Sequence, residues 1–206
     1  MSKIISIDGP SGSGKTTIAK LLASKLNSEY ISTGALYRSL SYLYINEGKE
    51  LSYIFDNLNI KSIDNQNIQV NEKMVLIKDL YTKEITDYTS KLSQRVDIRD
   101  IVTNRVREYV KDKDLTVVEG RDIGSVVFKD ALIKIYLDSP LELRAKRRVE
   151  QSMNIEGHDS LANRDEQDKN RLHSPLIIPD GAFIIDNENI SVEDIVNQII
   201  IEYKSL

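Results

Sequence analysis

A strand-like run, a glycine-rich loop and a helical stripe follow one another at the start of the chain, and this succession constrains the fold most. The apolar residues Ile4, Ile5 and Ile7 are typical of a short buried strand. Glycine, proline and serine fill residues 9–14, where a loop is expected. A stripe at helical spacing comes next, and its members are Ile18, Leu21, Leu22 and Leu26. The segment predicts a strand, a loop and a helix in direct sequence.

The loop has the spacing of a phosphate-binding loop, in which two glycines with four residues between them precede lysine and a hydroxyl residue. Glycines let backbone amides turn toward phosphate oxygens, and the helix that follows adds the positive end of its dipole. We expect Lys15 to act on the terminal phosphates as a catalytic residue and Thr16 to be the ligand of Mg²⁺. The residues expected at the bound phosphates are Gly9, Pro10, Ser11, Gly12, Ser13, Gly14, Lys15, Thr16 and Thr17.

Further strand signals recur along the chain. Thr116–Val118, Leu132–Leu137 and Ala182–Ile185 are short apolar runs bounded by turn residues. They alternate with helical patterns, which predicts an α/β fold with a central parallel sheet and helices on both faces. Together with the phosphate loop, these signals predict the three-layer architecture of P-loop NTPases.

Two helix starts can be predicted from capping residues. Ser139 offers an N-cap oxygen, Pro140 suits the first helical position, and Glu142 completes a capping box for a helix to about Gln151. Ser191 is expected to cap a C-terminal helix with an apolar stripe.

Two segments interrupt the alternation. Alternating runs at Ile60–Ile63, Ile68–Val70 and Met74–Ile77 predict antiparallel hairpins. The region from Met153 to Leu172 is polar and lacks apolar periodicity, so we interpret it as a mobile surface segment. We expect one domain over residues 1–206. Its core would cover about 1–55 and 91–206, with an inserted subdomain at about 56–90 and a short lid at about 152–172.

Composition excludes several classes of protein. The chain of 206 residues has no cysteine, so thiolate metal sites and disulfides are impossible, and a reducing cytoplasmic compartment is expected. A net charge of -4 argues against a general nucleic-acid partner. We found neither a signal peptide nor a run long enough to span a bilayer, so no membrane partner is expected. A monomer is the default expectation.

Arginines gather near the predicted loops. Arg121 and Asp122 follow the buried strand at Thr116–Val118, and ligands of open α/β sheets bind at the carboxyl ends of strands. For Arg144, Arg147 and Arg148 on one helix, a solvated face and an anion site are both open interpretations.

Transfer of a phosphoryl group between two nucleotides would use such arginines without a general base, because the acceptor is already an anion. His158 and His173 then need no catalytic role, and we expect both on the surface.

Several motifs together resemble those of bacterial cytidylate kinases. The resemblance spans nearly the whole chain in the same order, and the hairpin region is similar to the extra nucleotide-binding subdomain of bacterial members. The matching blocks are residues 7–15, 32–38, 119–128, 135–138 and 164–171.

The resemblance implies transfer of the γ-phosphoryl group of ATP, with Mg²⁺, to CMP or dCMP. Thr33, Arg38 and Arg121 would hold the CMP phosphate, with Gly34 beside them. Asp122 and Ser93 would contact the cytosine edge. Arg164 and Asp168 would meet the ribose.

The same resemblance assigns arginines to the transferring phosphate. Arg171 and Arg164 would reach it from the lid, and Arg148 would lie near the ATP end. The resemblance therefore implies that Arg121, Arg164 and Arg171 are catalytic, together with Lys15.

The chain departs from the family pattern at two places. Counting from Ser93, the position of a base-contacting arginine falls at Val102. Arg99 and Arg105 lie within one helical turn of it, and either could substitute for the missing arginine. The lid segment is shorter than in many members, and Gln167 stands where a basic residue is common.

Three other interpretations stay open at this point. The first is a P-loop kinase for another acceptor, such as UMP, dTMP, shikimate or dephospho-coenzyme A. The second is a nucleotide-binding switch or regulator, although the chain has no Asn-Lys-x-Asp guanine-reading motif. The third is a nucleic-acid-binding ATPase, which the acidic composition disfavours.

Overall fold

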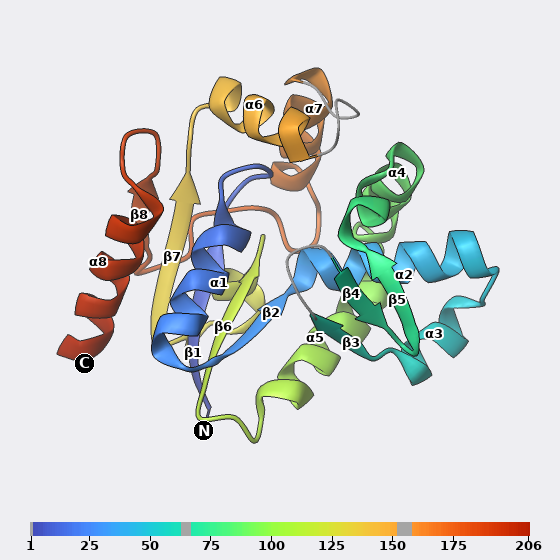
Figure 1. The fold of residues 1–206 in the computed structure, drawn as a ribbon, viewed down its shortest axis with the longest axis horizontal. Helices are drawn as coiled ribbons and strands as arrows, with labels where there is room; N and C mark the ends of the chain where they lie inside the picture. Colours follow the sequence, from blue (N-terminus) through green and yellow to red (C-terminus); the bar gives the residue numbers. More distant parts are fainter. Residues whose placement is uncertain (1, 63–66, 152–157) are drawn as a thin grey trace.

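A five-stranded parallel sheet with helices on both faces forms the centre of the computed structural model, which describes residues 2–62, 67–151 and 158–206 (Figure 1). The strand order is β2-β6-β1-β7-β8, and every neighbouring pair is parallel. The strands are β1 (Lys3–Asp8), β2 (Glu29–Ser32), β6 (Leu115–Gly120), β7 (Ile133–Asp138) and β8 (Phe183–Asp186). The predicted α/β fold is confirmed, although β2 was not predicted.

Alternating side chains of the central strands build two cores. Ile5, Ile7 and Val117 pack with α1 (Lys15–Leu26) and α8 (Val192–Ser205) on one face of the sheet. Ile4 and Val118 point to the other face and pack with the second helical layer. Its helices are α2 (Thr33–Glu47), α3 (Leu51–Asn57) and α5 (Val96–Val110).

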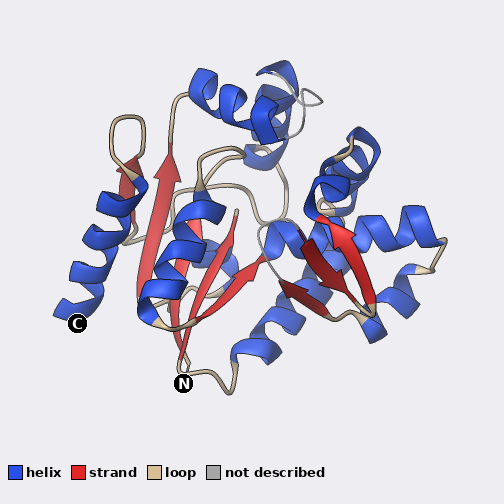
Figure 2. Cartoon of the chain, in the orientation of Figure 1, coloured by secondary structure: helices blue, strands red, loops and turns tan. Residues whose placement is uncertain are grey.

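A second, antiparallel sheet stands apart from the first, as the two groups of strands in Figure 2 show. Its strands are β3 (Ile60–Ser62), β4 (Asn67–Val70) and β5 (Lys73–Leu76), followed by η1 (Ile77–Tyr81) and α4 (Lys83–Leu92). This confirms the predicted hairpins, except that Ile63 lies outside the described residues. Ile68, Val70 and Val75 share a core with α2, so the small sheet is packed onto the main body.

Helices α6 (Leu141–Gln151) and α7 (His158–Lys169) lie beyond the carboxyl ends of the central strands (Figure 1). We interpreted Met153–Leu172 as a mobile surface segment, and its placement on the surface was wrong for α7, because Leu161, Asp165 and Asp168 are buried. Residues 152–157 of that segment lie outside the described part of the chain. Both histidines are exposed, as predicted.

One predicted helix cap was right and the other was wrong. The Ser191 hydroxyl accepts a hydrogen bond from Asp194 N at 3.1 Å and caps α8. Helix α6 begins only at Leu141, after Pro140, and Ser139 Oγ has no hydrogen-bond partner among the described residues. The capping box therefore does not form. The Ser139 carbonyl instead accepts from Arg144 Nε at 2.9 Å. Within the described residues, no helix is long and apolar enough to cross a membrane.

Asp8, at the end of β1, holds the turn that follows β6. Its carboxylate accepts hydrogen bonds from Ile123 N and Gly124 N, both at 2.7 Å, at the start of the π-helical turn η2 (Ile123–Val127). Burial of this carboxylate raises its pKa to about 6, although the two amides oppose the shift. Asp8 thus fixes the backbone directly after Arg121 and Asp122.

Replacing Asp8 with Asn is expected to change stability in a pH-dependent way. The folded pKa of about 6 lies above the ordinary value of 3.8, so the carboxyl group stabilises the fold below about pH 4 and loses this contribution as pH rises to about 6. The free energy of unfolding of the wild type relative to Asp8→Asn should fall by roughly 1 to 3 kcal/mol across that window. Urea unfolding at several pH values checks this, and a pH-independent difference would contradict it.

Candidate active site

The loop between β1 and α1 adopts backbone conformations that require glycine. Gly9 has φ of 147°, and a Cβ there would lie 2.1 Å from the Leu137 carbonyl oxygen. Gly12 has φ of 77°, and its Cβ would lie 2.8 Å from the Arg144 carbonyl oxygen. Side chains at either position would clash with backbone. The loop is therefore shaped by its close approach to β7 and α6.

Buried polar side chains hold the outer side of this loop. Arg144 Nη1 donates to the Ser11 carbonyl at 3.1 Å, and Asn187 Nδ2 donates to the Ser13 carbonyl at 2.6 Å. Arg147 Nη1 donates to Asn187 Oδ1 at 3.0 Å. Arg144 and Arg148 are buried, so a solvated helix face does not describe them. Asn187 was not predicted, although its place directly after β8 puts it at the same sheet edge as the loop.

Lys15, the first residue of α1, is folded back onto the loop. Its Nζ donates to the Pro10 carbonyl at 2.7 Å and to Ser13 Oγ at 3.3 Å. Burial, with Arg121 nearby, lowers the pKa of Lys15 to about 7. The protein therefore does not fully stabilise the positive charge of the buried Lys15 ammonium group. An anion bound in the pocket would stabilise the protonated form of this lysine.

Binding of ATP is therefore expected to take up a proton at Lys15. At about pH 8 the free lysine is mostly neutral, and phosphate oxygens should raise its pKa so that it binds close to one proton. Affinity for ATP should consequently fall as pH rises above about 7. Calorimetry in two buffers with different ionisation enthalpies measures the uptake. Its absence from the wild type, or its persistence in Lys15→Met, would contradict this expectation.

Oxygen groups suited to a divalent cation lie beside the loop. Thr16 Oγ1 donates to Glu119 Oε1 at 2.8 Å, and Tyr30 Oη donates to the same oxygen at 2.6 Å. Glu119 is buried at the end of β6, and burial raises the pKa of Tyr30 well above its usual range. A hydroxyl and a carboxylate are the hard ligands that Mg²⁺ prefers, so this pair fits the ion. Glu119 was missed as a site residue, although it directly precedes the Gly120-Arg121-Asp122 motif.

The start of α2 faces the same space. The Ser32 hydroxyl accepts from Ala35 N at 3.2 Å as the N-cap, and Thr33 Oγ1 donates to the Glu119 carbonyl at 3.0 Å. Arg38 lies about one turn further on, and its Nη1 donates to the Leu80 carbonyl at 2.7 Å and to Thr86 Oγ1 at 2.8 Å. A helix N-terminus with a nearby arginine is suited to bind an anion.

Asp122 pairs with Arg99, and not with a residue at position 102. Arg99 Nη2 forms a buried ion pair with Asp122 Oδ2, and Arg99 Nη1 donates to the Ser93 carbonyl at 2.9 Å. Val102 is buried in the core, and Arg105 donates to the Phe55 carbonyl at 2.8 Å. Arg99 is the arginine that joins Ser93 and Asp122.

Asp168 on α7 brings two predicted arginines together. Its carboxylate accepts from Arg121 Nε at 2.9 Å and lies 2.8 Å from Arg171 Nη2. Asp165, on the same helix, accepts from Arg144 Nη1 at 2.6 Å. Through these ion pairs α7 is tied both to the end of β6 and to the helix that supports the phosphate loop.

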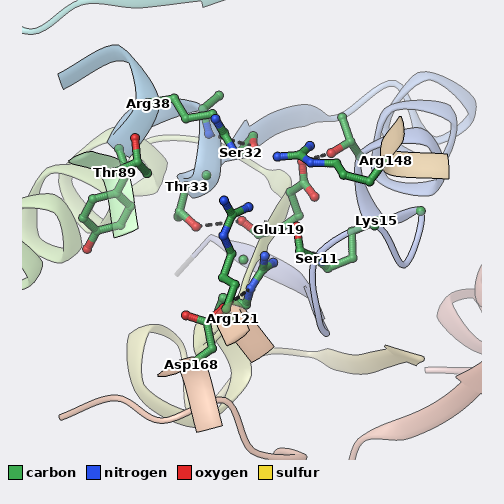
Figure 3. A pocket seen from close by; sticks show the side chains of 18 of the residues that line it. Ser11, Lys15, Ser32, Thr33, Arg38, Thr89, Glu119, Arg121, Arg148 and Asp168 are labelled. Atoms are coloured by element: carbon green, nitrogen blue, oxygen red, sulfur yellow. Dashed lines mark hydrogen bonds and ion pairs between the residues drawn. The ribbon is translucent and has the colours of Figure 1, made fainter. Parts of the chain in front are cut away.

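One pocket of about 740 Å³ lies between these elements, and Figure 3 shows Arg38, Arg121 and Arg148 directed into it from different elements, while Lys15 also lines it. Gly9, Pro10 and Ser13 support its wall and do not line it. The predicted site residues that line it are Ser11, Gly12, Gly14, Lys15, Thr16, Thr17, Thr33, Gly34, Arg38, Ser93, Arg121, Asp122, Arg148, Arg164, Asp168 and Arg171.

Comparison with known proteins identifies the family. The sequence profile described as "Cytidylate kinase" matches residues 5–205. The chain belongs to the cytidylate kinase family. It is 41% identical to a cytidylate kinase of Chlamydia caviae over 96% of both chains. It is also 39% identical to a cytidylate kinase of Thermosipho melanesiensis, over 95% of this chain and 94% of that one.

Solved structures agree on the fold of this family member. An uncharacterized protein from Eubacterium ventriosum aligns over all of both chains with a TM-score of 0.57 and 17% identity. A gluconokinase from Sinorhizobium meliloti aligns over all of this chain and 98% of its own, with a TM-score of 0.54 and 13% identity. At these identities the likeness concerns the fold alone, and it supports the predicted P-loop kinase architecture.

Proposed function

We propose that this protein transfers the γ-phosphoryl group of ATP to CMP or dCMP, giving ADP and CDP or dCDP. The observation that carries the proposal is the buried Arg99–Asp122 pair beside Ser93, in the same pocket as the phosphate loop. An enzyme that only hydrolysed ATP would not need this second group of polar side chains in the pocket.

The pair is complementary to one edge of cytosine. Cytosine presents an amino donor at N4, with acceptors beside it at N3 and O2. The Asp122 carboxylate can accept from N4, and Arg99 can donate to the ring acceptors. Uracil has a carbonyl oxygen in place of the amino group, so this oxygen would face the Asp122 carboxylate without a hydrogen bond and would be repelled by its negative charge. The pocket therefore favours CMP over UMP.

The arginines would align the two phosphates for direct transfer. A phosphate oxygen of CMP attacks the γ-phosphorus of ATP as the bond to the bridging oxygen breaks, and the bridging oxygen leaves with ADP. Thr33, Arg38 and Arg121 would hold the acceptor phosphate, while Lys15, Arg164 and Arg171 would neutralise charge on the transferring group. No proton has to be removed, because the attacking oxygen is already ionised. The carboxylate–arginine pairs of Asp168 would open or rearrange when nucleotides bind.

A Mg²⁺ ion fits beside the phosphate loop. Thr16 and Glu119 would hold it, and when bound with ATP it supplies positive charge that neutralises the developing negative charge on the phosphates. The role of the protein is to keep the Thr16 hydroxyl and the Glu119 carboxylate together, which Tyr30 assists by its hydrogen bond.

The proposal includes a monomeric cytoplasmic enzyme with a core, an insert at about 56–90 and a lid at about 152–172. The separate sheet β3-β4-β5 supports the insert. Light scattering after size exclusion checks the monomer.

Titration of CMP and then UMP into the protein by calorimetry tests the acceptor site independently of turnover. We expect CMP to bind at least about tenfold more tightly than UMP, because one charged hydrogen bond separates them. Equal affinities for CMP and UMP would contradict the role of Asp122 in recognising cytosine. The absence of CMP binding would contradict the proposed function itself.

A further inference from the structure

Tyr81 contacts one arginine from each side of the active site. Its ring centroid lies 4.2 Å from the guanidinium carbon of Arg38 and 4.7 Å from that of Arg148. Tyr81 ends η1 in the insert, whereas Arg38 belongs to α2 and Arg148 to α6. Figure 3 shows these two arginines approaching the same part of the pocket from separate helices. Three segments distant in sequence therefore meet at one aromatic ring that lines the pocket.

The two arginines serve opposite ends of the proposed reaction. Arg38 lies near the start of α2, where the acceptor phosphate would bind. Arg148 follows Arg144 on α6, and Arg144 holds the Ser11 carbonyl of the phosphate loop. A shift of α6 relative to the loop would therefore move Arg148 at the ring, and a shift of Arg38 would do the same from the acceptor side.

The contact with the ring is favourable for both cations. Arg38 and Arg148 are 7% and 4% exposed, so water competes weakly with the negative face of the ring. Arg38 is also held by the Leu80 carbonyl and Thr86, on either side of Tyr81 in sequence. The insert and Arg38 thus move together, and Tyr81 is their contact to Arg148.

We infer that Tyr81 is a positioning residue that couples the two nucleotide sites, an inference that rests on the proposed function. When ATP binds, it would fix the position of Arg148, and Arg148 would fix the Tyr81 ring. The ring would then hold Arg38 in the position that binds the phosphate of CMP. Linkage requires the reverse effect to be equal, so CMP should tighten ATP binding by the same factor.

The effect depends on the ring and not on its hydroxyl or its apolar area. Tyr81→Phe keeps the aromatic face and should keep the coupling. Tyr81→Leu keeps much of the apolar area but has no quadrupole to attract the guanidinium groups. A residue that only filled space would tolerate leucine equally well.

The test is the affinity for CMP measured by calorimetry with and without a non-hydrolysable ATP analogue and Mg²⁺. The wild type and Tyr81→Phe should bind CMP about 5- to 10-fold more tightly when the analogue is present. In Tyr81→Leu this ratio should fall to about 1 to 2, with binding of CMP alone weakened much less. Tyr53→Leu is the matched control, because Tyr53 also contacts a cation, Lys49 at 4.8 Å, but lies away from the pocket.

Other results would overturn the inference. One is a ratio of CMP affinities, with and without the analogue, that stays at the wild-type value in Tyr81→Leu. Another is a ratio that falls to about 1 in Tyr81→Phe, and a third is a wild type whose CMP affinity does not change with the analogue. If Tyr81→Leu fails to fold, Tyr81→Met replaces it, since methionine adapts to irregular surroundings. A wild type that binds both nucleotides without coupling overturns only the role of Tyr81, whereas a wild type that does not bind CMP overturns the proposed function as well.

Discussion

Replacing Lys15 with Met is expected to lower kcat/KM by about 10²- to 10³-fold, equivalent to roughly 3 to 4 kcal/mol of transition-state stabilisation. The lysine is buried at the base of the phosphate loop, where a positive charge acts strongly on phosphate oxygens. Methionine has a similar length but neither charge nor hydrogen-bond donors. Steady-state rates with ATP and CMP measure the loss.

The same substitution should leave the protein folded. Lys15 is an incompletely compensated buried cation, as its lowered pKa shows, so an apolar side chain should cost little and its thermal unfolding temperature should stay the same or rise. Lys20→Met, on the same helix but outside the pocket, is the matched control and should be fully active. A near-normal rate in Lys15→Met would contradict the assignment of the phosphate loop.

Replacing Asp122 with Asn is expected to lower kcat/KM for CMP by about 10²-fold, or roughly 3 kcal/mol, with a much smaller change for UMP. The asparagine amide can offer a donor to the uracil carbonyl, whereas the native carboxylate cannot. The substitution also weakens the partner of Arg99, so part of the loss will be common to both bases. The informative quantity is the ratio of the two losses.

Asp100→Asn controls for the loss of a negative charge in this region, because Asp100 is exposed and follows Arg99 on α5. It should not change the preference between CMP and UMP. Equal losses for both bases in Asp122→Asn would mean that Asp122 does not read the base.

The elements with local signals were predictable from the sequence. The phosphate loop is encoded by glycines that no other residue could replace, as the close approach of Gly9 to the Leu137 carbonyl shows. The short apolar runs of β1, β6 and β7 also match the structure, because buried parallel strands are apolar on both faces. The apolar run of β8 matches as well, although Phe183 and Ile184 of this edge strand are exposed. The phosphate loop and these strands are determined by residues close together in sequence, so local patterns are enough to predict them.

Helix α7 was missed because its inner face is polar. Leu161 is its buried hydrophobic residue, and Asp165 and Asp168 are buried through ion pairs with arginines far away in sequence. Apolar periodicity does not detect a helix that is held in this way. Arg99 was not singled out for a related reason, since the turn before α5 decides which residue faces Asp122, and this turn has no apolar pattern.

The residues that support the site could not be predicted from sequence patterns either. Asn187, Glu119 and Asp8 act through hydrogen bonds to the loop, to Thr16 and to η2. Each joins segments about 100 residues or more apart, as the separations of 174, 103 and 115 show. Only the folded arrangement of the sheet edge brings them together.

The most direct test of this account is a coupled assay of ADP release with Mg²⁺ and ATP, run separately with CMP, dCMP, UMP, AMP, dTMP and no acceptor. We predict rapid turnover with CMP and dCMP and little with the others. ADP release that does not depend on an acceptor, or a rate with UMP equal to that with CMP, would contradict it.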